Sequence, residues 1–363
     1  MSWRAFLLAV TLLLALGGCG AGEGGEGDAE RTFYGGRTLE LLVPFGPGGG
    51  TDTWTRMVVP HLQRYLGPRA GIQVVNVPGA MSVAGANEFA LRRRPDGRTA
   101  LVSGGSTFFL YLLGQPEVRS EFLDYEAIVS SPVGGVVFVS PDLGIRGAAE
   151  LGRLGRRLTY GGISATGNDL LPLLAFELLG LDVQTILGYR SKGETRVAFE
   201  RGETEIEYQT MPAYLASVVP LIEEGRAVPL FTFGIMNDEG ELVRDPEVSD
   251  LPTVGEVYRT VEGREPSGVV WDAYRAVVGA GIEMQKVMWL HGDAPPEAVE
   301  ELRSAAARMV EDSLFRADAE REVGRYPFRV GEAVERTFRA AADVPPDALA
   351  WLRDFAARER GAR

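Results

Sequence analysis

A glycine-rich stretch near residue 46 constrains the fold of this chain more than any other feature. The apolar run at 41–43 leads into residues 44–50, which hold four glycines and two prolines. Thr51 and Asp52 then open a segment whose apolar residues recur every three or four positions, so the order predicts a strand, a glycine loop and a helix that begins near Thr51. The unpaired N–H groups and positive dipole end of such a helix attract anions, and glycine lets a ligand approach the main chain.

Two common phosphate-binding interpretations of this loop do not fit. A dinucleotide fingerprint requires glycine where Thr51 stands, and a Walker loop requires a lysine that is missing here. An anion-binding loop and a tight turn without a ligand both stay open. In an anion-binding loop, a side chain at Gly49 would either force positive φ on a residue that resists it or occupy the place of the anion. Asp52 is expected to cap the helix or orient the loop and not to touch the anion, because two negative charges repel each other.

Alternating strands and helices follow the loop. Strands are predicted at residues 72–77, 99–103, 158–162 and 228–233. Because this alternation indicates parallel sheets, in which ligands sit beyond the carboxyl ends of the strands, the loops at 46–52, 78–83 and 104–107 are expected at one edge. Residues 163–169 form another loop of small residues, which opens a helix at 170–179.

Three segments together resemble a known family. They are VPFGPGGGTD, NVPGAMSVAGAN at 76–87 and RRRPDGRTALV at 92–102. They are similar, in order and spacing, to the VPF-x-x-GGG-x-D loop, the N-x-PGA-G-x-x-G-x-x segment and the PDG-x-T strand of the extracytoplasmic solute receptors of tripartite tricarboxylate transporters, the TctC or Bug-like proteins. The resemblance is close over residues 40–105 and looser from about 130 to 310. It implies an α/β fold of the type II periplasmic-binding-protein kind, with two doubly wound lobes, mainly parallel sheets and a central ligand cleft.

The resemblance also implies a function and a set of ligand contacts. The protein would capture a small organic dicarboxylate, tricarboxylate or related anion between its lobes and deliver it to the membrane subunits of such a transporter. The family has an aspartate that contacts the far end of the ligand, but residues 205–210 of this chain hold none. Tyr208 and Gln209 are therefore expected to face the cleft, unless they are ordinary strand-end residues. The expected ligand-binding residues are Phe45, Gly48, Gly49, Gly50, Thr51, Asp52, Ala80, Ser106, Ser164, Ala165, Thr166, Gly167, Asn168, Tyr208 and Gln209.

The first 19 residues predict export. Arg4 precedes a short apolar run, and small residues lead to Cys19, the single cysteine of the chain. A cysteine in this position resembles the lipobox of bacterial lipoproteins, where it becomes lipidated, although an ordinary signal peptide with an incidental cysteine is the alternative. Residues 20–32 carry no large apolar side chain and predict a flexible acidic tether.

The remaining chain is predicted to form two lobes, the first from residues 33–137 and 230–363 and the second from 138–229. A net charge of −13 and an isoelectric point near 4.9 make nucleic acid and anionic membrane surfaces poor partners. With the resemblance and the export signal, the expectation is a monomer that reaches the membrane only through its lipid anchor, on the extracytoplasmic side of a bacterial envelope. Which membrane carries the anchor stays open.

The sequence contains little that could support catalysis. His61 and His291 lie far apart without a metal-binding motif, and neither a nucleophile elbow nor another pairing of a nucleophile with its base is present. We expect a binding protein with no metal, no cofactor and no enzymatic activity. A lipid-anchored sensor that uses the same binding fold without transport is the main alternative, and an exported hydrolase comes last.

Overall fold

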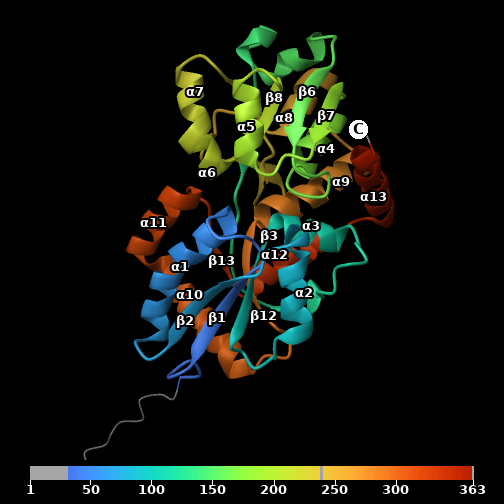
Figure 1. The fold of residues 1–363 in the computed structure, drawn as a ribbon. Helices are drawn as coiled ribbons and strands as arrows, with labels where there is room; N and C mark the ends of the chain where they lie inside the picture. The colour runs from blue at the N-terminus through green and yellow to red at the C-terminus, as the bar shows by residue number, and fades with distance from the viewer. Residues whose placement is uncertain (1–31, 238–239, 362–363) are drawn as a thin grey trace, which may run out of the picture. The chain divides into compact units, whose positions relative to one another are not determined.

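Two β-sheets flanked by helices organise the chain (Figure 1). The computed structural model describes residues 32–237 and 240–361. The described residues from Phe33 onward form one compact unit. The predicted signal peptide at 1–19 with Cys19, and the predicted tether at 20–32 up to residue 31, lie outside the described residues.

The larger sheet has six strands in the order β13-β4-β12-β3-β1-β2 and is called lobe 1 together with its helices. Its strands are β1 (Thr38–Val43), β2 (Gly71–Asn76), β3 (Thr99–Gly104), β4 (Glu126–Ser131), β12 (Lys286–Leu290) and β13 (Arg329–Val330). β1 pairs parallel with β2 and β3, whereas β12 runs antiparallel to β3 and β4. The carboxyl ends of β1, β3 and β4 therefore lie at the same edge of the sheet as the first residue of β12.

The smaller sheet has five strands in the order β7-β6-β8-β5-β9 and defines lobe 2. Its strands are β5 (Gly135–Val139), β6 (Leu158–Gly162), β7 (Val183–Leu187), β8 (Ile206–Thr210) and β9 (Val228–Thr232). β6 pairs parallel with β7 and β8, but β5 is antiparallel to β8 and β9. Both sheets are thus mixed, and the expected parallel pairing holds in only part of each. The predicted lobe boundaries, at 137/138 and 229/230, fall inside β5 and β9.

Helices cover both faces of the lobe 1 sheet. α1 (Gly50–Leu66) packs against α10 (Pro296–Glu311) and α11 (Ser313–Val323). Its buried apolar side chains recur every four positions, at Trp54, Val58, Leu62 and Leu66. Leu41 and Val43 of β1 join this core, while Leu42 points to the opposite face, as alternation along a strand requires. That other face is covered by α2 (Val83–Arg92), α3 (Gly105–Leu112) and α12 (Glu332–Ala342).

The helices of lobe 2 surround its sheet in the same manner. They are α4 (Leu170–Leu178), α5 (Lys192–Glu200), α6 (Met211–Ala213), α7 (Val219–Glu223) and α8 (Val254–Glu262). α8 begins with a capping box in which the hydroxyl of Thr253 accepts from the N–H of Glu256, and the carboxylate of Glu256 accepts from the N–H of Thr253. A short two-stranded sheet of β10 (Ile235–Met236) and β11 (Leu242–Val243) follows β9.

Two further helices connect the lobes on one side. α9 (Val269–Val278) contacts α4 of lobe 2, α12 of lobe 1 and α13 (Pro346–Gly361). α13 reaches both lobes, because Arg353 donates to the carbonyl of Leu113 at 2.9 Å while Glu359 accepts from Thr185 at 3.4 Å. The predicted assignment of residues 230–363 to lobe 1 therefore leaves out the contacts that α13 makes with lobe 2.

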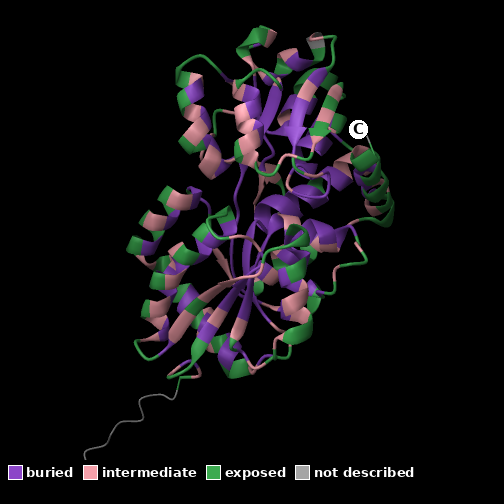
Figure 2. Cartoon of the chain, in the orientation of Figure 1, coloured by how far each residue is buried: buried purple, intermediate pink, exposed green. Residues whose placement is uncertain are grey.

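A continuous apolar core runs through this connected side. One core cluster holds residues of both lobes, such as Phe109 of α3 and Leu171 of α4. Gly281 lies where they meet: a Cβ there would stand 2.3 Å from Phe109 and 3.0 Å from Leu171. Figure 2 shows the central strands of both sheets as buried. Among the residues that the structure describes, no helix is both long and apolar enough to cross a membrane.

Candidate ligand-binding site

A cavity of about 890 Å³ lies between the two lobes. Lobe 1 contributes the loop at 46–51, Gly104, Ser106 and Lys286, and lobe 2 contributes residues that include Asn168, Lys192 and Gln209. Cavities of this volume are typical of sites for small molecules. The carboxyl ends of strands in both lobes reach the cavity. The cavity therefore lies at the strand ends, where ligands bind in sheets of this kind.

The glycine loop of lobe 1 presents the beginning of α1 to the cavity. The first helical hydrogen bond runs from the N–H of Thr53 to the carbonyl of Gly49, so the N–H groups of Gly50, Thr51 and Asp52 precede it. Gly48 has φ +77°, a conformation that favours glycine, whereas Gly49 has φ −74°. Of the two effects expected for a side chain at Gly49, forced positive φ is therefore excluded, because the left-handed turn occurs one residue earlier.

Asp52 holds this loop in place and does not line the cavity. Its buried carboxylate accepts from the N–H of Gly48 at 2.8 Å, from Arg56 at 2.9 Å and from Asn76 at 2.9 Å. Asn76 also donates to the carbonyl of Phe45. These hydrogen bonds, with that from Arg56 first, lower the pKa of Asp52 to about 2 despite its burial. Asp52 thus orients the loop, in agreement with the role expected for it.

A second aspartate organises the loop at 163–169 in lobe 2. Asp169 is buried and accepts from the N–H groups of Ile163 and Ser164, at 2.7 and 3.2 Å, and from the hydroxyl of Tyr160. The hydroxyl of Ser164 pairs with that of Thr166 within the loop. Polar groups of this loop therefore form hydrogen bonds with one another, which leaves fewer of them for a ligand in the cavity.

Asn168 is the polar side chain of this loop that reaches the cavity. Its buried amide oxygen has no hydrogen-bond partner within the described part of the chain. An unsatisfied buried oxygen costs free energy, so a ligand that donates a hydrogen bond here would stabilise the site.

Lys192 contributes little positive charge to the cavity. Its ammonium lies 2.8 Å from the carboxylate of Glu207 and 3.3 Å from that of Asp169. Burial opposes its charge, but the two carboxylates outweigh burial and raise the pKa of Lys192. Burial also raises the pKa of Glu207, which accepts a further hydrogen bond from Thr195. One ammonium is thus shared by two carboxylates.

Lys286 is a charged residue of the cavity that the sequence prediction did not include. It is the first residue of β12, lines the cavity and is nine-tenths buried. It makes no ion pair with any described residue, and its one hydrogen bond, to the side-chain oxygen of Gln285, is long at 3.4 Å. Burial lowers the pKa of Lys286 to about 8. The chain has only two lysines, Lys192 and Lys286, and both line this cavity.

The structure brings eight of the fifteen predicted ligand-binding residues to the cavity. These are Phe45, Gly48, Gly49, Gly50, Thr51, Ser106, Asn168 and Gln209. The other seven do not line it: Asp52, Ala80, Ser164, Ala165, Thr166, Gly167 and Tyr208.

Tyr208 and Ala80 are kept from the cavity for different reasons. The ring of Tyr208 is fully buried and packs edge-on against Phe233. Ala80 belongs to a short turn in which Ala80, Met81 and Ser82 all have positive φ, at 46°, 52° and 84°. Left-handed backbone is costly for residues with a side chain, so this turn stores strain.

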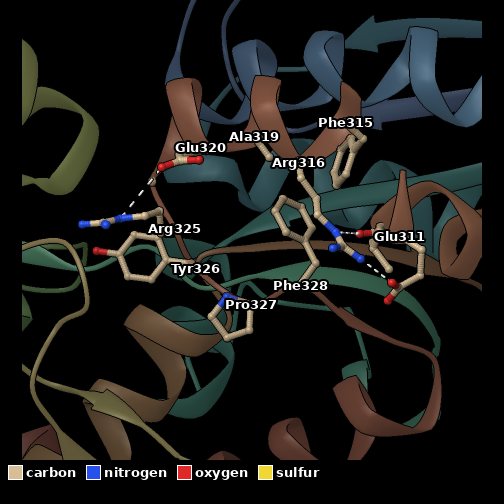
Figure 3. Close-up of a pocket in the computed structure, with 11 residues that line it drawn as sticks. Glu311, Phe315, Arg316, Ala319, Glu320, Arg325, Tyr326, Pro327 and Phe328 are labelled. Atoms are coloured by element: carbon tan, nitrogen blue, oxygen red, sulfur yellow. Dashed lines mark hydrogen bonds and ion pairs between the residues drawn. The ribbon is translucent and has the colours of Figure 1, made fainter. Parts of the chain in front are cut away.

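A second cavity, of about 410 Å³, lies against α11 in lobe 1 (Figure 3). Arg316 and Arg325 are among the residues that line it, and both are ion-paired, Arg316 with Glu311 and Arg325 with Glu247 and Glu320. Their charges are therefore already compensated. The cavity between the lobes differs because the ammonium of Lys286 has no such carboxylate among the residues that the structure describes.

The described residues do not offer a metal site of the usual kind. His61 of α1 contacts the carboxylate of Asp318 in α11 at 2.8 Å. Within residues 32–237 and 240–361, no group of three or more His, Cys, Asp or Glu side chains is arranged to hold a metal ion.

Comparisons with known proteins agree with this architecture. No protein-family model matches the chain. A UPF0065 protein of Bordetella pertussis, strain Tohama I, is 26% identical over 252 residues, which are 67% of this chain and 71% of that protein. The crystal structure of a TctC solute-binding protein from Polaromonas, without ligand, superposes with a TM-score of 0.65 at 18% identity, over 90% of this chain and 99% of that one. The chain has the fold of TctC-type solute-binding proteins.

The same TctC-type fold occurs in a structure with a ligand. R. palustris Rpa4515, solved with adipate, matches with a TM-score of 0.59 at 19% identity, over 90% of this chain and 97% of that one. The resemblance that the three sequence motifs predicted is therefore confirmed for the fold. At these identities the superposition does not transfer individual ligand contacts, so the contacts of this chain have to be argued from its own residues.

Proposed function

We propose that this chain is an extracytoplasmic solute-binding protein that captures a small carboxylate between its two lobes. The observation that carries this proposal is the beginning of α1: Gly50 and Thr51 line the cavity between the lobes, and their N–H groups precede the first helical hydrogen bond. A helix N-terminus with free donors binds anions without needing a cationic side chain, which suits a protein of net charge −13. The adipate in the R. palustris structure supports a dicarboxylate as the first class to test.

The captured solute would be delivered to a membrane transporter of the tripartite tricarboxylate type. Residues 1–19 would direct export, lipidated Cys19 would anchor the protein, and the tether at 20–32 would let a monomeric receptor reach the transporter. In this proposal the protein carries no cofactor or metal and catalyses no reaction. Nucleic acid is not a partner in this proposal, because the acidic charge of the chain disfavours its binding.

Calorimetry against a panel of aliphatic mono-, di- and tricarboxylates that includes adipate tests this function. We expect at least one carboxylate to bind, to raise the melting temperature and to reduce the radius of gyration, since a ligand held by both lobes favours a closed state. Mass spectrometry of solutes released by denaturing the purified protein extends the panel to the native ligand. A protein that binds none of these anions and releases no carboxylate would contradict the proposal.

A further inference from the structure

Lys286 reaches the cavity because β12 runs against its neighbours. In the sheet, Lys286 lies directly opposite Gly104, the last residue of β3. Side chains of opposed residues in an antiparallel pair project to the same face. A Cβ at Gly104 would stand 3.1 Å from the ring of Phe45 and 3.3 Å from the hydroxyl of Thr51. The side chain of Lys286 therefore projects toward the side of the sheet where α1 begins.

The environment of Lys286 is costly unless an anion is present. Burial of an unpaired ammonium is unfavourable, and proteins normally pair such a group with a carboxylate. The other cations that line the cavity follow this rule: Lys192 binds Glu207, Arg190 binds Glu194 and Arg196 binds Glu200. Lys286 departs from it, because no carboxylate of the described residues pairs with it. A negative charge on a ligand would offset the cost of burying this ammonium.

We propose that Lys286 determines the charge specificity of the site, and that its ammonium and the first N–H groups of α1 bind one carboxylate of the solute together. This inference rests on the proposed function and adds the residue that separates an anionic solute from a neutral one of the same shape. A charge-assisted hydrogen bond to an ammonium is about twice as strong as a neutral one and gains further strength in a buried site.

The two walls of the cavity also give the bound solute a direction. In lobe 2 the charge of Lys192 is taken up by Asp169 and Glu207, and the neutral amides of Asn168 and Gln209 face the cavity. Lobe 1 supplies the uncompensated ammonium and the positive end of α1. The carboxylate therefore binds in lobe 1, and the remainder of the solute extends toward the amides of lobe 2.

Calorimetry on Lys286→Met, Lys286→Arg and the parent protein tests this assignment. The probe is adipate, or the carboxylate of the panel that the parent binds most tightly. Methionine keeps a similar length without the charge, so affinity should fall by roughly ten- to a hundredfold, while arginine should recover part of the loss. Without ligand, Lys286→Met should melt at the same or a higher temperature, because an unpaired buried charge has been removed.

Arg316→Met is the matched control. It removes one positive charge from lobe 1 outside the site, where Arg316 is already paired with Glu311, and should leave the affinity unchanged. If Lys286→Met binds the probe as tightly as the parent, the role of Lys286 is wrong while the proposed function stands. If the parent binds no carboxylate of the panel, both fail. A lower melting temperature of Lys286→Met together with unchanged affinity would show a structural role only.

Discussion

Asp52 and Asp169 perform the same task in different lobes. Each lies close to the start of the helix that follows a loop, and each accepts hydrogen bonds from main-chain N–H groups of that loop: Gly48 for Asp52, and Ile163 and Ser164 for Asp169. The two loops face one cavity through Gly48 and Ile163. A buried carboxylate thus shapes each wall of the site without lining the cavity.

The role of Asp52 predicts a specific dependence of stability on pH. Its pKa is lowered to about 2 in the folded protein, against an unfolded value near 3.9. The stability that it contributes is therefore fully present above about pH 5 and is lost as the pH falls toward 2. We expect Asp52→Asn to unfold at lower denaturant concentration than the parent at pH 7, and the difference to shrink between pH 5 and pH 2.

Ligand binding should respond much less to this change. Because asparagine keeps an oxygen that can accept from Gly48, the folded Asp52→Asn protein should bind the probe carboxylate at least as well as the parent. A large loss of affinity at an unchanged melting temperature would mean that the carboxylate of Asp52 contacts the ligand directly.

Substitutions at Gly48 and Gly50 should separate folding from binding. Gly48→Ala places a side chain at φ +77°, so it should lower the free energy of unfolding by about 1–2 kcal/mol. A Cβ at Gly50 meets no atom within 4 Å and stands at the first position of a helix. Gly50→Ala should therefore keep or raise the melting temperature and yet weaken probe binding, because its methyl group occupies space at the helix end that lines the cavity.

Denaturant unfolding and calorimetry on the two variants measure both quantities. Unchanged affinity in Gly50→Ala would indicate that the ligand does not approach the beginning of α1, and the loop would then be needed for folding alone.

A substitution at Met81 should raise the stability of the protein. It is 45% exposed and has φ 52° and ψ 43°, a left-handed conformation that costs a residue with a side chain about 1–2 kcal/mol. Met81→Gly should relieve most of this cost and raise the free energy of unfolding by about 1 kcal/mol, as read from denaturant midpoints. Leu91→Gly, at an exposed position of α2, is the control and should lower stability by a similar amount. A destabilised Met81→Gly protein would show that the turn is not strained.

The titration of Lys286 gives a test that requires no ligand. Its pKa is about 8 in the folded protein and near 10.4 in an unfolded chain, so the unfolded state binds more protons between these values. Stability should accordingly rise with pH over this window, and the rise should be smaller in Lys286→Met. Urea unfolding at pH 7.5, 8.5 and 9.5 measures the slope. Equal slopes in the two proteins would contradict a depressed pKa at Lys286.

The predicted anchor can be tested by fractionation. Lipid chains supply on the order of 0.8 kcal/mol per buried CH₂, and the described residues contain no helix suited to span a membrane. Cys19→Ser should therefore move the protein from the membrane pellet to the supernatant of lysed cells. If the serine variant stays in the pellet after a salt wash, the lipoprotein interpretation is wrong.

Local sequence patterns predicted the positions of the strands well but not the direction in which each strand runs in its sheet. The strand predicted at 158–162 coincides with β6, and that at 99–103 differs from β3 by one residue, because apolar runs and turns are encoded locally. The direction of β12 is set by the path of the whole chain. Lys286 is the first residue of β12, and only an antiparallel β12 places its first residue at the ligand edge. This is why the residue with the unpaired charge was missed.

The error at Tyr208 has a simpler cause. Tyr208 and Gln209 are neighbours on β8, and neighbouring strand residues point to opposite faces. Gln209 lines the cavity, whereas the ring of Tyr208 packs against Phe233. The partner choices of Ser164 and Thr166 could not be predicted either, because both depend on how the loop folds around Asp169.

The shared apolar core behind the cavity limits how independent the two lobes can be. Phe109 and Leu171 belong to one cluster across the lobe boundary, Gly281 has no room for a side chain between them, and α13 bonds to both lobes. Separation of the lobes would expose this shared apolar core to water at a large cost in free energy. We therefore expect the lobes to unfold as a single cooperative unit, and the proposed closure on a ligand to be a small rotation about this shared core rather than the docking of two freely moving domains.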